Sequence, residues 1–332
     1  EPRCPAELRR LVSPGFPFAE AEADRNAARF FAASSEAGPP AGWRREPKPR
    51  LGLASELDEI ARKYRPSHDM RRWQKQFGCA GGDTGEEANF YTPVYNRLFN
   101  HRLPAESSPP GPSRFLPAKI LEVGVCDGSG VAMWAEYFSH ADTRIVAMDL
   151  DKTLFGGNRP YLCQKGFDLA RLEAVVEANA SDLSGEAIVT RSWGLDGQST
   201  TKLETLEALQ THGPFDFIRD DASHLASEMV ATFQALFPRL LRPGGVYVVE
   251  DMWSYPVFKD VETALDASGE YAYFFRLARD AANMGWRYDG STFGGIEGAA
   301  WIQSPSADAF EAWVDSVEFA RGQVVIRKRF AA

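Results

Sequence analysis

The segment ILEVGVCDGSG, residues 120–130, indicates the architecture of this chain. It leads from an apolar run at 118–125 into a loop with glycines at positions 124, 128 and 130. Glycines let a ligand approach the backbone, and the helix expected at 129–138 offers free N–H groups at its start. The spacing is not GxGxxG, so a dinucleotide fingerprint fits poorly. A plain strand-to-helix turn is the competing interpretation.

Apolar runs alternate with helical patterns on both sides of this loop. We expect strands at 118–125, 144–150, 187–190, 215–218, 245–249, 299–303 and 323–328. We expect helices at 21–34, 51–64, 90–99, 129–138, 167–178, 202–210, 226–241 and 308–317. Pro238 should distort the helix that contains it. Short buried strands alternating with helices predict an α/β fold, with a parallel sheet covered on both faces.

Asp149 ends the second expected strand, about 25 residues beyond the glycine at position 124. A carboxylate in that place can accept hydrogen bonds from ribose hydroxyls, as in nucleotide-binding α/β folds. Acidic residues often end strands, so Asp149 alone is a weak signal. The glycine loop and the acid together predict a nucleoside site.

Further acidic residues follow two later strands. Asp220 and Asp221 end one strand, and Glu250 and Asp251 end the next. Parallel strands bring their C-terminal ends to one edge, where crowded carboxylates repel each other unless a cation lies between them. A hard divalent ion such as Mg²⁺ suits these oxygen ligands, although helix caps and solvated loop acids are an alternative. His224 lies three residues after Asp221 and is a candidate general base near neutral pH.

Composition excludes some classes of function. The formal net charge is −9, with no basic stripe, so a nucleic-acid partner is not expected. No apolar stretch is long enough to span a membrane, and no signal peptide is visible. The chain begins at Glu1, so a targeting or anchoring segment could have been removed. Its four cysteines lack CxxC spacing and are too few for a disulfide scaffold, but one bridge, for example Cys79 to Cys163, is left open.

Four segments together resemble a known family: LEVGVCDGSGVAMW, AMDLD, FDFIRDDASH and LFPRLLRPGGVYVVEDMWSY. They are similar to the metal-dependent S-adenosylmethionine (SAM) O-methyltransferases of macrolide sugars, of the mycinamicin and tylosin type, which are related to the cephalosporin hydroxylase family. The resemblance covers roughly residues 78–330. It implies a Rossmann-like class I methyltransferase fold with a mostly parallel seven-stranded sheet. A helical N-terminal extension at 1–75 would precede the methyltransferase domain at 76–332.

The resemblance also implies roles for individual residues. SAM and Mg²⁺ would be the cofactors, and the acceptor would be a sugar hydroxyl on a natural product or glycan. The catalytic residues would be His224, as general base, and Asp221. The cofactor-binding residues would be Glu122, Gly124, Gly128, Ser129, Asp149 and Asp196, and the metal ligands Asp221, Glu250 and Asp251. Two positions depart from the family pattern, namely Ala222, where glycine is more usual, and Cys126.

Other interpretations are open at this point. A metal-dependent oxygenase is one, although a facial-triad iron site needs two histidines and the edge offers one. A methyltransferase acting on a catechol-like molecule is another, and a non-catalytic module with the same fold is a third. Aromatic residues that could line an acceptor pocket are Tyr91, Tyr95, Trp253 and Tyr255. The sequence leaves open whether the chain forms a homo-oligomer. The expected location is the cytoplasm, or the Golgi lumen if an anchor was removed.

Overall fold

The computed structural model of this 332-residue chain describes several separate stretches of it. They are residues 55–64, 91–101, 111–150, 152–178, 202–222, 226–252, 273–275, 277–278, 281, 286–288, 301–303, 313–320 and 322–330. The expected helix at 21–34, the expected strand at 187–190, Asp196 and His224 lie outside these residues.

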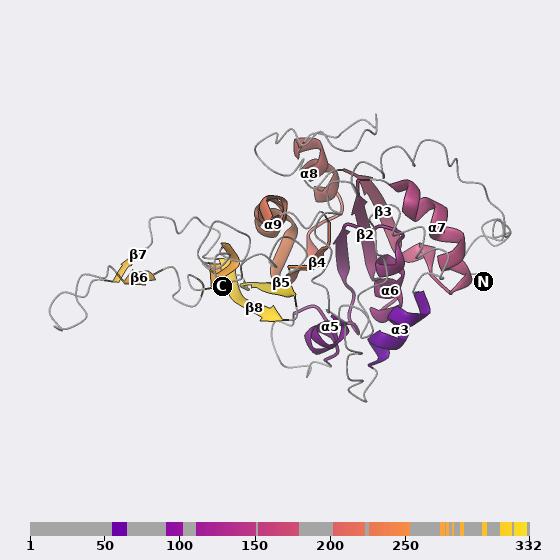
Figure 1. The fold of residues 1–332 in the computed structure, drawn as a ribbon, viewed down its shortest axis with the longest axis horizontal. Helices are drawn as coiled ribbons and strands as arrows, with labels where there is room; N and C mark the ends of the chain where they lie inside the picture. The colour runs from indigo at the N-terminus through magenta and orange to yellow at the C-terminus, as the bar shows by residue number, and fades with distance from the viewer. Residues whose placement is uncertain are drawn as a thin grey trace, which may run out of the picture.

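A seven-stranded sheet forms the centre of the protein (Figure 1). Its strands are β1 (Lys119–Val123), β2 (Arg144–Asp149), β3 (Leu172–Glu177), β4 (Phe215–Asp220), β5 (Leu241–Val249), β8 (Val314–Ala320) and β9 (Gln323–Lys328). The order is β3-β2-β1-β4-β5-β9-β8. Strands β1 to β5 pair in parallel, whereas β9 runs antiparallel to both β5 and β8. The predicted α/β class with a mostly parallel sheet is confirmed.

The strand order reverses between β1 and β4, because the chain runs outward from β1 to β3 and then returns to the other side of β1. In open α/β sheets, ligands bind beyond the C-terminal ends of the strands at such a point. The fold therefore places the ends of β1 and β4 side by side at the expected position of a site. A separate two-stranded antiparallel sheet contains β6 (Trp286–Tyr288) and β7 (Trp301–Gln303).

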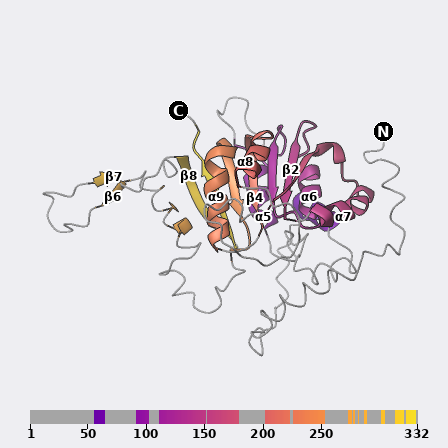
Figure 2. The same cartoon turned by 90° about the horizontal axis from the view of Figure 1, so that it is seen from above.

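Helices cover both faces of the sheet (Figures 1 and 2). One face packs against α3 (Glu56–Tyr64), α5 (Thr92–Phe99), α6 (Ser129–Tyr137) and α7 (Lys152–Gln164). The other packs against α8 (Lys202–Gln210) and α9 (Ala226–Leu240). Successive strand side chains point to opposite faces, so Ile120 and Phe217 enter the first core while Leu121 and Ile218 enter the second. Pro238 lies inside α9, and the distortion expected there stays a prediction.

Two predicted helices are wrong where the structure describes them. Within 167–178 the chain forms the 3₁₀ turn η1 (Leu169–Arg171) and then β3, and residues 314–317 belong to β8. Both segments pair at the edges of the sheet, and those backbone hydrogen bonds override local helix propensity. The helix α7 was not predicted, because its sequence contains two glycines and a proline. Burial of Phe155 and Leu162 in the core supports it instead.

Helix α3 lies within the predicted N-terminal extension, yet it packs against α6. Leu57 and Ile60 are buried in the same core as the sheet. The Tyr64 hydroxyl donates to Glu136 Oε2 at 2.6 Å, and the Ser129 hydroxyl donates to the Tyr64 carbonyl at 3.0 Å. This helix thereby supports the start of α6, next to the glycine loop. Within the described stretches, no helix has the length and apolar character that crossing a membrane requires.

Candidate active site

Polar side chains from four neighbouring strands form a row near the C-terminal edge of β1, β4 and β5. Glu122 and Arg219 are partners in the β1–β4 register. Glu122 follows Ile120 by two residues, and Arg219 follows Phe217 by two. Because side chains alternate along a strand, both point to the face of the sheet that α5 and α6 cover. Glu250 follows Val248 in the same way, and Gln323 begins β9 two residues before Val325. The row is thus a consequence of strand register.

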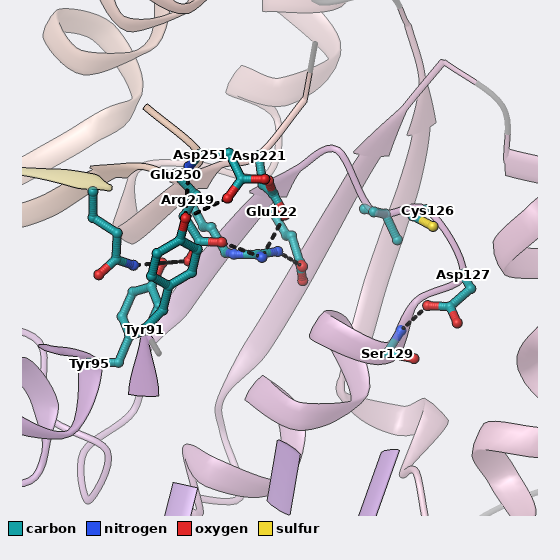
Figure 3. A network of polar contacts seen from close by, with 12 residues as sticks. Tyr91, Tyr95, Glu122, Cys126, Asp127, Ser129, Arg219, Asp221, Glu250 and Asp251 are labelled. Atoms are coloured by element: carbon teal, nitrogen blue, oxygen red, sulfur yellow. Dashed lines mark hydrogen bonds and ion pairs between the residues drawn. The ribbon is translucent and has the colours of Figure 1, made fainter. Parts of the chain in front are cut away.

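Arg219 is the centre of this row (Figure 3). Its Nη1 donates to Glu122 Oε1, and its Nη2 donates to Asp221 Oδ2 and to Glu250 Oε2, both at 2.6 Å. Arg219 is 3% exposed, and Glu122 and Glu250 are fully buried. Asp221 is partly exposed and marks the side of the cluster that solvent reaches. One guanidinium therefore holds three carboxyl groups at the edge of the sheet.

Tyr91, which directly precedes α5, and Tyr95 within α5 hold the acidic residues from the helix side. The Tyr95 hydroxyl donates to Glu250 Oε1, which also accepts from Gln323 Nε2 at 3.0 Å. The Tyr91 hydroxyl donates to Asp251 Oδ1 and accepts from the Asp251 N–H at 3.3 Å. Both tyrosines are fully buried and bond carboxylates, which differs from the acceptor-lining role considered for them. Asp251 has a φ of 53°, uncommon for a residue other than glycine, and these two contacts hold it there.

Burial changes the protonation of this cluster. It raises the pKa of Glu122 to about 8, against the lowering effect of Arg219. It also raises the pKa of Glu250 to about 7, again opposed by Arg219, with nearby Asp221 adding to the increase. Near neutral pH, Glu122 is therefore mostly protonated and Glu250 partly so. The cluster carries far less negative charge than its carboxyl groups suggest.

Crowded carboxylates at this edge repel each other unless a cation lies between them, and Arg219 supplies positive charge there. Among the residues that the structure describes, no group of three or more His, Cys, Asp or Glu side chains is arranged to hold a metal ion. Oxygens of Asp221 and Glu250 converge on Nη2 of Arg219. Asp221, Glu250 and Asp251 offer the carboxylate oxygens that Mg²⁺ prefers. Their role as metal ligands stays a prediction.

The glycine loop lies directly against the end of β4. Gly124 has a φ of +81°, and a Cβ built on it would lie 2.1 Å from the Asp221 carbonyl oxygen. Only glycine fits this backbone and this space. The Asp221 N–H donates to the Val123 carbonyl at 2.9 Å, which joins the two strand ends. The loop and the acidic edge are therefore neighbouring parts of one site.

Asp149 lies beside the same loop, as predicted. Its Oδ2 accepts from the N–H groups of Val125 and Cys126 at 2.6 and 2.7 Å. The side chain is partly exposed and fixes the loop against the end of β2. A partly exposed carboxylate next to a glycine loop is chemically suited to a ribose. Asp149 as a ribose ligand stays a prediction.

The first turn of α6 is held by close contacts. Gly128 has a φ of +82°, and a Cβ there would lie 2.1 Å from the Phe155 ring. The Ser129 N–H donates to Asp127 Oδ1 at 2.9 Å. A Cβ on Gly130 would lie 2.1 Å from Glu122 Oε1, so the missing side chain leaves room for that buried carboxyl group. Glu122 thus packs beneath the helix that begins at the loop.

Cys126 and Cys163 are both disulfide-bonded, and no described cysteine is free. Cys126 lies in the glycine loop with a φ of 52°, and Cys163 lies in α7. Cysteine is unusual at position 126 of such a loop, and in the structure this position carries a covalent link. Cys4 and Cys79 lie outside the described residues.

Two groups of predicted residues are brought together. Glu122, Asp221 and Glu250 bond Arg219, and Asp251, next to Glu250 in the chain, bonds Tyr91. Gly124, Gly128, Ser129 and Asp149 form the adjacent loop region. Sequence reasoning missed Arg219. The available signal was its place directly after the apolar strand at 215–218 and beside Asp220 and Asp221, because a charge buried at a strand end needs partners.

Comparisons with known proteins match part of this chain to methyltransferases. Residues 121–252 match a family model described as a methyltransferase domain. This region runs from β1, through the glycine loop and Asp149, to the acidic residues after β5. The resemblance to sugar O-methyltransferases drawn from the motifs is confirmed by the relatives.

One relative is the 8-demethyl-8-(2-methoxy-alpha-L-rhamnosyl)-tetracenomycin-C 3'-O-methyltransferase of Streptomyces olivaceus. It is 27% identical over 173 residues, which cover 50% of this chain and 33% of that protein. Another is the mycinamicin VI 2''-O-methyltransferase of Micromonospora griseorubida, 45% identical over 60 residues, which cover 18% of this chain and 15% of that protein. This chain thus aligns with a third or less of the length of these relatives.

A solved structure shares the fold. It is the MycE methyltransferase of mycinamycin biosynthesis in complex with Mg, SAH and mycinamycin VI. The TM-score is 0.50 at 18% sequence identity, and the match covers 83% of this chain and 54% of that chain. At this identity the likeness concerns the fold, which is that of a class I SAM methyltransferase.

Proposed function

We propose that this chain transfers the methyl group of SAM to a hydroxyl group of a sugar. The observation that carries the proposal is the match of residues 121–252 to a methyltransferase domain, because this segment contains the glycine loop, Asp149 and the acidic edge. The relatives named above are O-methyltransferases whose names specify rhamnosyl-tetracenomycin and mycinamicin substrates. These names favour a sugar attached to a polyketide as the acceptor class.

The reaction needs little covalent chemistry from the protein. The acceptor oxygen attacks the methyl carbon, a C–O bond forms, the S–C bond breaks, and S-adenosylhomocysteine leaves as a neutral thioether. The glycine loop would hold SAM near the end of β1, and Asp149 would accept hydrogen bonds from the ribose. Catalysis would then depend largely on holding the two reactants in line.

Removal of the acceptor proton is the second requirement. His224, three residues after Asp221 in the chain, is the residue that we propose as general base. Mg²⁺ is part of the proposal, with Asp221, Glu250 and Asp251 as ligands, and when bound it would lower the pKa of an acceptor hydroxyl. Arg219, Tyr91 and Tyr95 would keep those carboxylates oriented at the edge of the sheet.

The test starts with calorimetric titration of SAM and S-adenosylhomocysteine, with Mg²⁺ and with chelator. Wild-type protein should bind both ligands, and Asp149→Ala should weaken binding by about tenfold or more, because a charge-assisted contact and the support of the loop are both lost. Asp142→Ala is the matched control, since it removes an exposed aspartate two residues before the opposite end of β2.

Transfer of a labelled methyl group from SAM is then measured over rhamnosylated polyketides and their aglycones. Labelling of the glycosides alone supports the sugar as acceptor, and His224→Ala should abolish it. Absence of SAM binding by the wild-type protein in both conditions would overturn the proposal. Labelling of the aglycones would show that the acceptor is a non-sugar hydroxyl.

A further inference from the structure

Two carboxylates of the proposed metal site converge on a single nitrogen atom of Arg219. Asp221 Oδ2 and Glu250 Oε2 both accept from Nη2 of Arg219, each at 2.6 Å. These oxygens come from the ends of neighbouring strands, β4 and β5. The point between them is a cation position, and in the structure a side chain of the protein fills it.

The guanidinium is fixed in this position from its other side. Its Nη1 donates to Glu122 Oε1, and only 4% of the Arg219 side chain is exposed. Glu122 is confined in turn by Gly130, where even a methyl group would collide with Oε1. Because a guanidinium keeps its proton in proteins, the positive charge is permanent. A divalent ion bound to Asp221 or Glu250 would therefore meet a like charge at close range.

We infer that Arg219 is a positioning residue that sets the affinity of the acidic edge for divalent cations. It holds Asp221 and Glu250 in place when no ion is bound, and it weakens the binding of Mg²⁺ to the same carboxylates. The inference rests on the proposed function only in assuming that these acidic residues can bind Mg²⁺. The wild-type site then requires a higher Mg²⁺ concentration than the same carboxylates would need without Arg219.

The experiment is a titration of the full chain with Mg²⁺ alone, without SAM or acceptor, by calorimetry. Arg219→Met removes the charge while keeping a long side chain, and in titrations buffered at about pH 9, where protons compete least for the carboxylates, it should bind Mg²⁺ more tightly than wild type by about tenfold or more. Arg219→Lys keeps the charge and should remain close to wild type. The double variant Arg219→Met with Asp221→Asn should lose the tight binding, which locates the ion at this edge.

Thermal unfolding supplies a second readout, because Arg219→Met leaves buried carboxyl groups without their cation. Mg²⁺ should raise the midpoint of unfolding more for Arg219→Met than for wild type, since the ion replaces the lost charge. Equal Mg²⁺ affinity in wild type and Arg219→Met would overturn the inference. So would an Arg219→Met chain that stays unfolded at every Mg²⁺ concentration. A SAM titration of the same samples reports separately on the proposed function, because SAM binding can fail while the metal affinities still differ.

Discussion

Replacing Glu122 with glutamine should reduce the dependence of folding stability on pH between pH 7 and 9. Glu122 is fully buried, and burial raises its pKa to about 8. The unfolded chain exposes this carboxyl group, whose pKa then returns to the ordinary value of 4.5. Because the folded-state pKa is the higher one, the folded protein binds the proton more tightly. Its contribution to stability is complete below the unfolded pKa and is lost as the pH rises through 8.

The magnitude follows from that shift. At pH 7 a group with a pKa of 8 is about ten parts protonated to one ionised in the folded state, whereas it is almost fully ionised in the unfolded state. At pH 9 both states are mostly ionised, so the folded-state advantage is nearly gone. The free energy of unfolding should therefore fall by about 1.4 kcal/mol from this group alone. Glutamine at position 122 can still accept from Arg219 and does not titrate.

The assay is urea unfolding of wild type and Glu122→Gln at both pH values, in the presence of chelator. Comparing the two proteins cancels the titration of the groups that do not interact with Glu122. Glu207→Gln, an exposed position on α8, controls for the change in net charge. If wild type and Glu122→Gln lost equal stability between pH 7 and 9, the carboxyl group would not be protonated in the fold, and the reasoning would be refuted.

Two further predictions concern the glycine loop. Gly124→Ala should destabilise the protein by at least about 2 kcal/mol, because alanine is strained at this left-handed φ and its Cβ would collide with the Asp221 carbonyl oxygen. Gly156→Ala on α7, where a Cβ meets nothing, should be neutral or stabilising. Thermal unfolding of both variants checks this difference. Cys126 and Cys163 should resist maleimide labelling in the denatured protein until a reductant is added, as peptide mass spectrometry can show. Labelling of either cysteine without reductant would contradict the disulfides in the structure.

Much of the sheet could be predicted from sequence alone. The segments around 118–125 and 215–218 are short apolar runs bounded by polar residues, and such runs are typical of buried strands. The glycines after the first run and the acid that ends the second strand likewise indicated the loop and its partner Asp149. These are local patterns, carried by residues close together in the chain, so they can be recognised without knowing the fold.

The strands β3 and β8 could not be predicted in this way. Both overlap segments that the sequence predicted as helix, and pairing with β2 and β9 makes them strands. The same holds for α7, whose glycines and proline argue against a helix, although the burial of Phe155 supports one. The β2–β3 pairs join residues that are far apart in the chain, whereas β8 pairs with the adjacent strand β9, which is itself held by β5. The helix α7 depends on a core already formed.

The same distinction between local patterns and tertiary contacts applies to the site. The sequence by itself determined that acidic residues follow two neighbouring parallel strands, since strand ends are local and parallel strands share an edge. It did not determine what balances their charge. The register that pairs Glu122 with Arg219, and the position of α5 with Tyr95 over Glu250, exist only in the folded sheet. Tertiary structure therefore decided that a buried guanidinium lies among the carboxyl groups, because partner choice depends on distances that the order of residues does not specify.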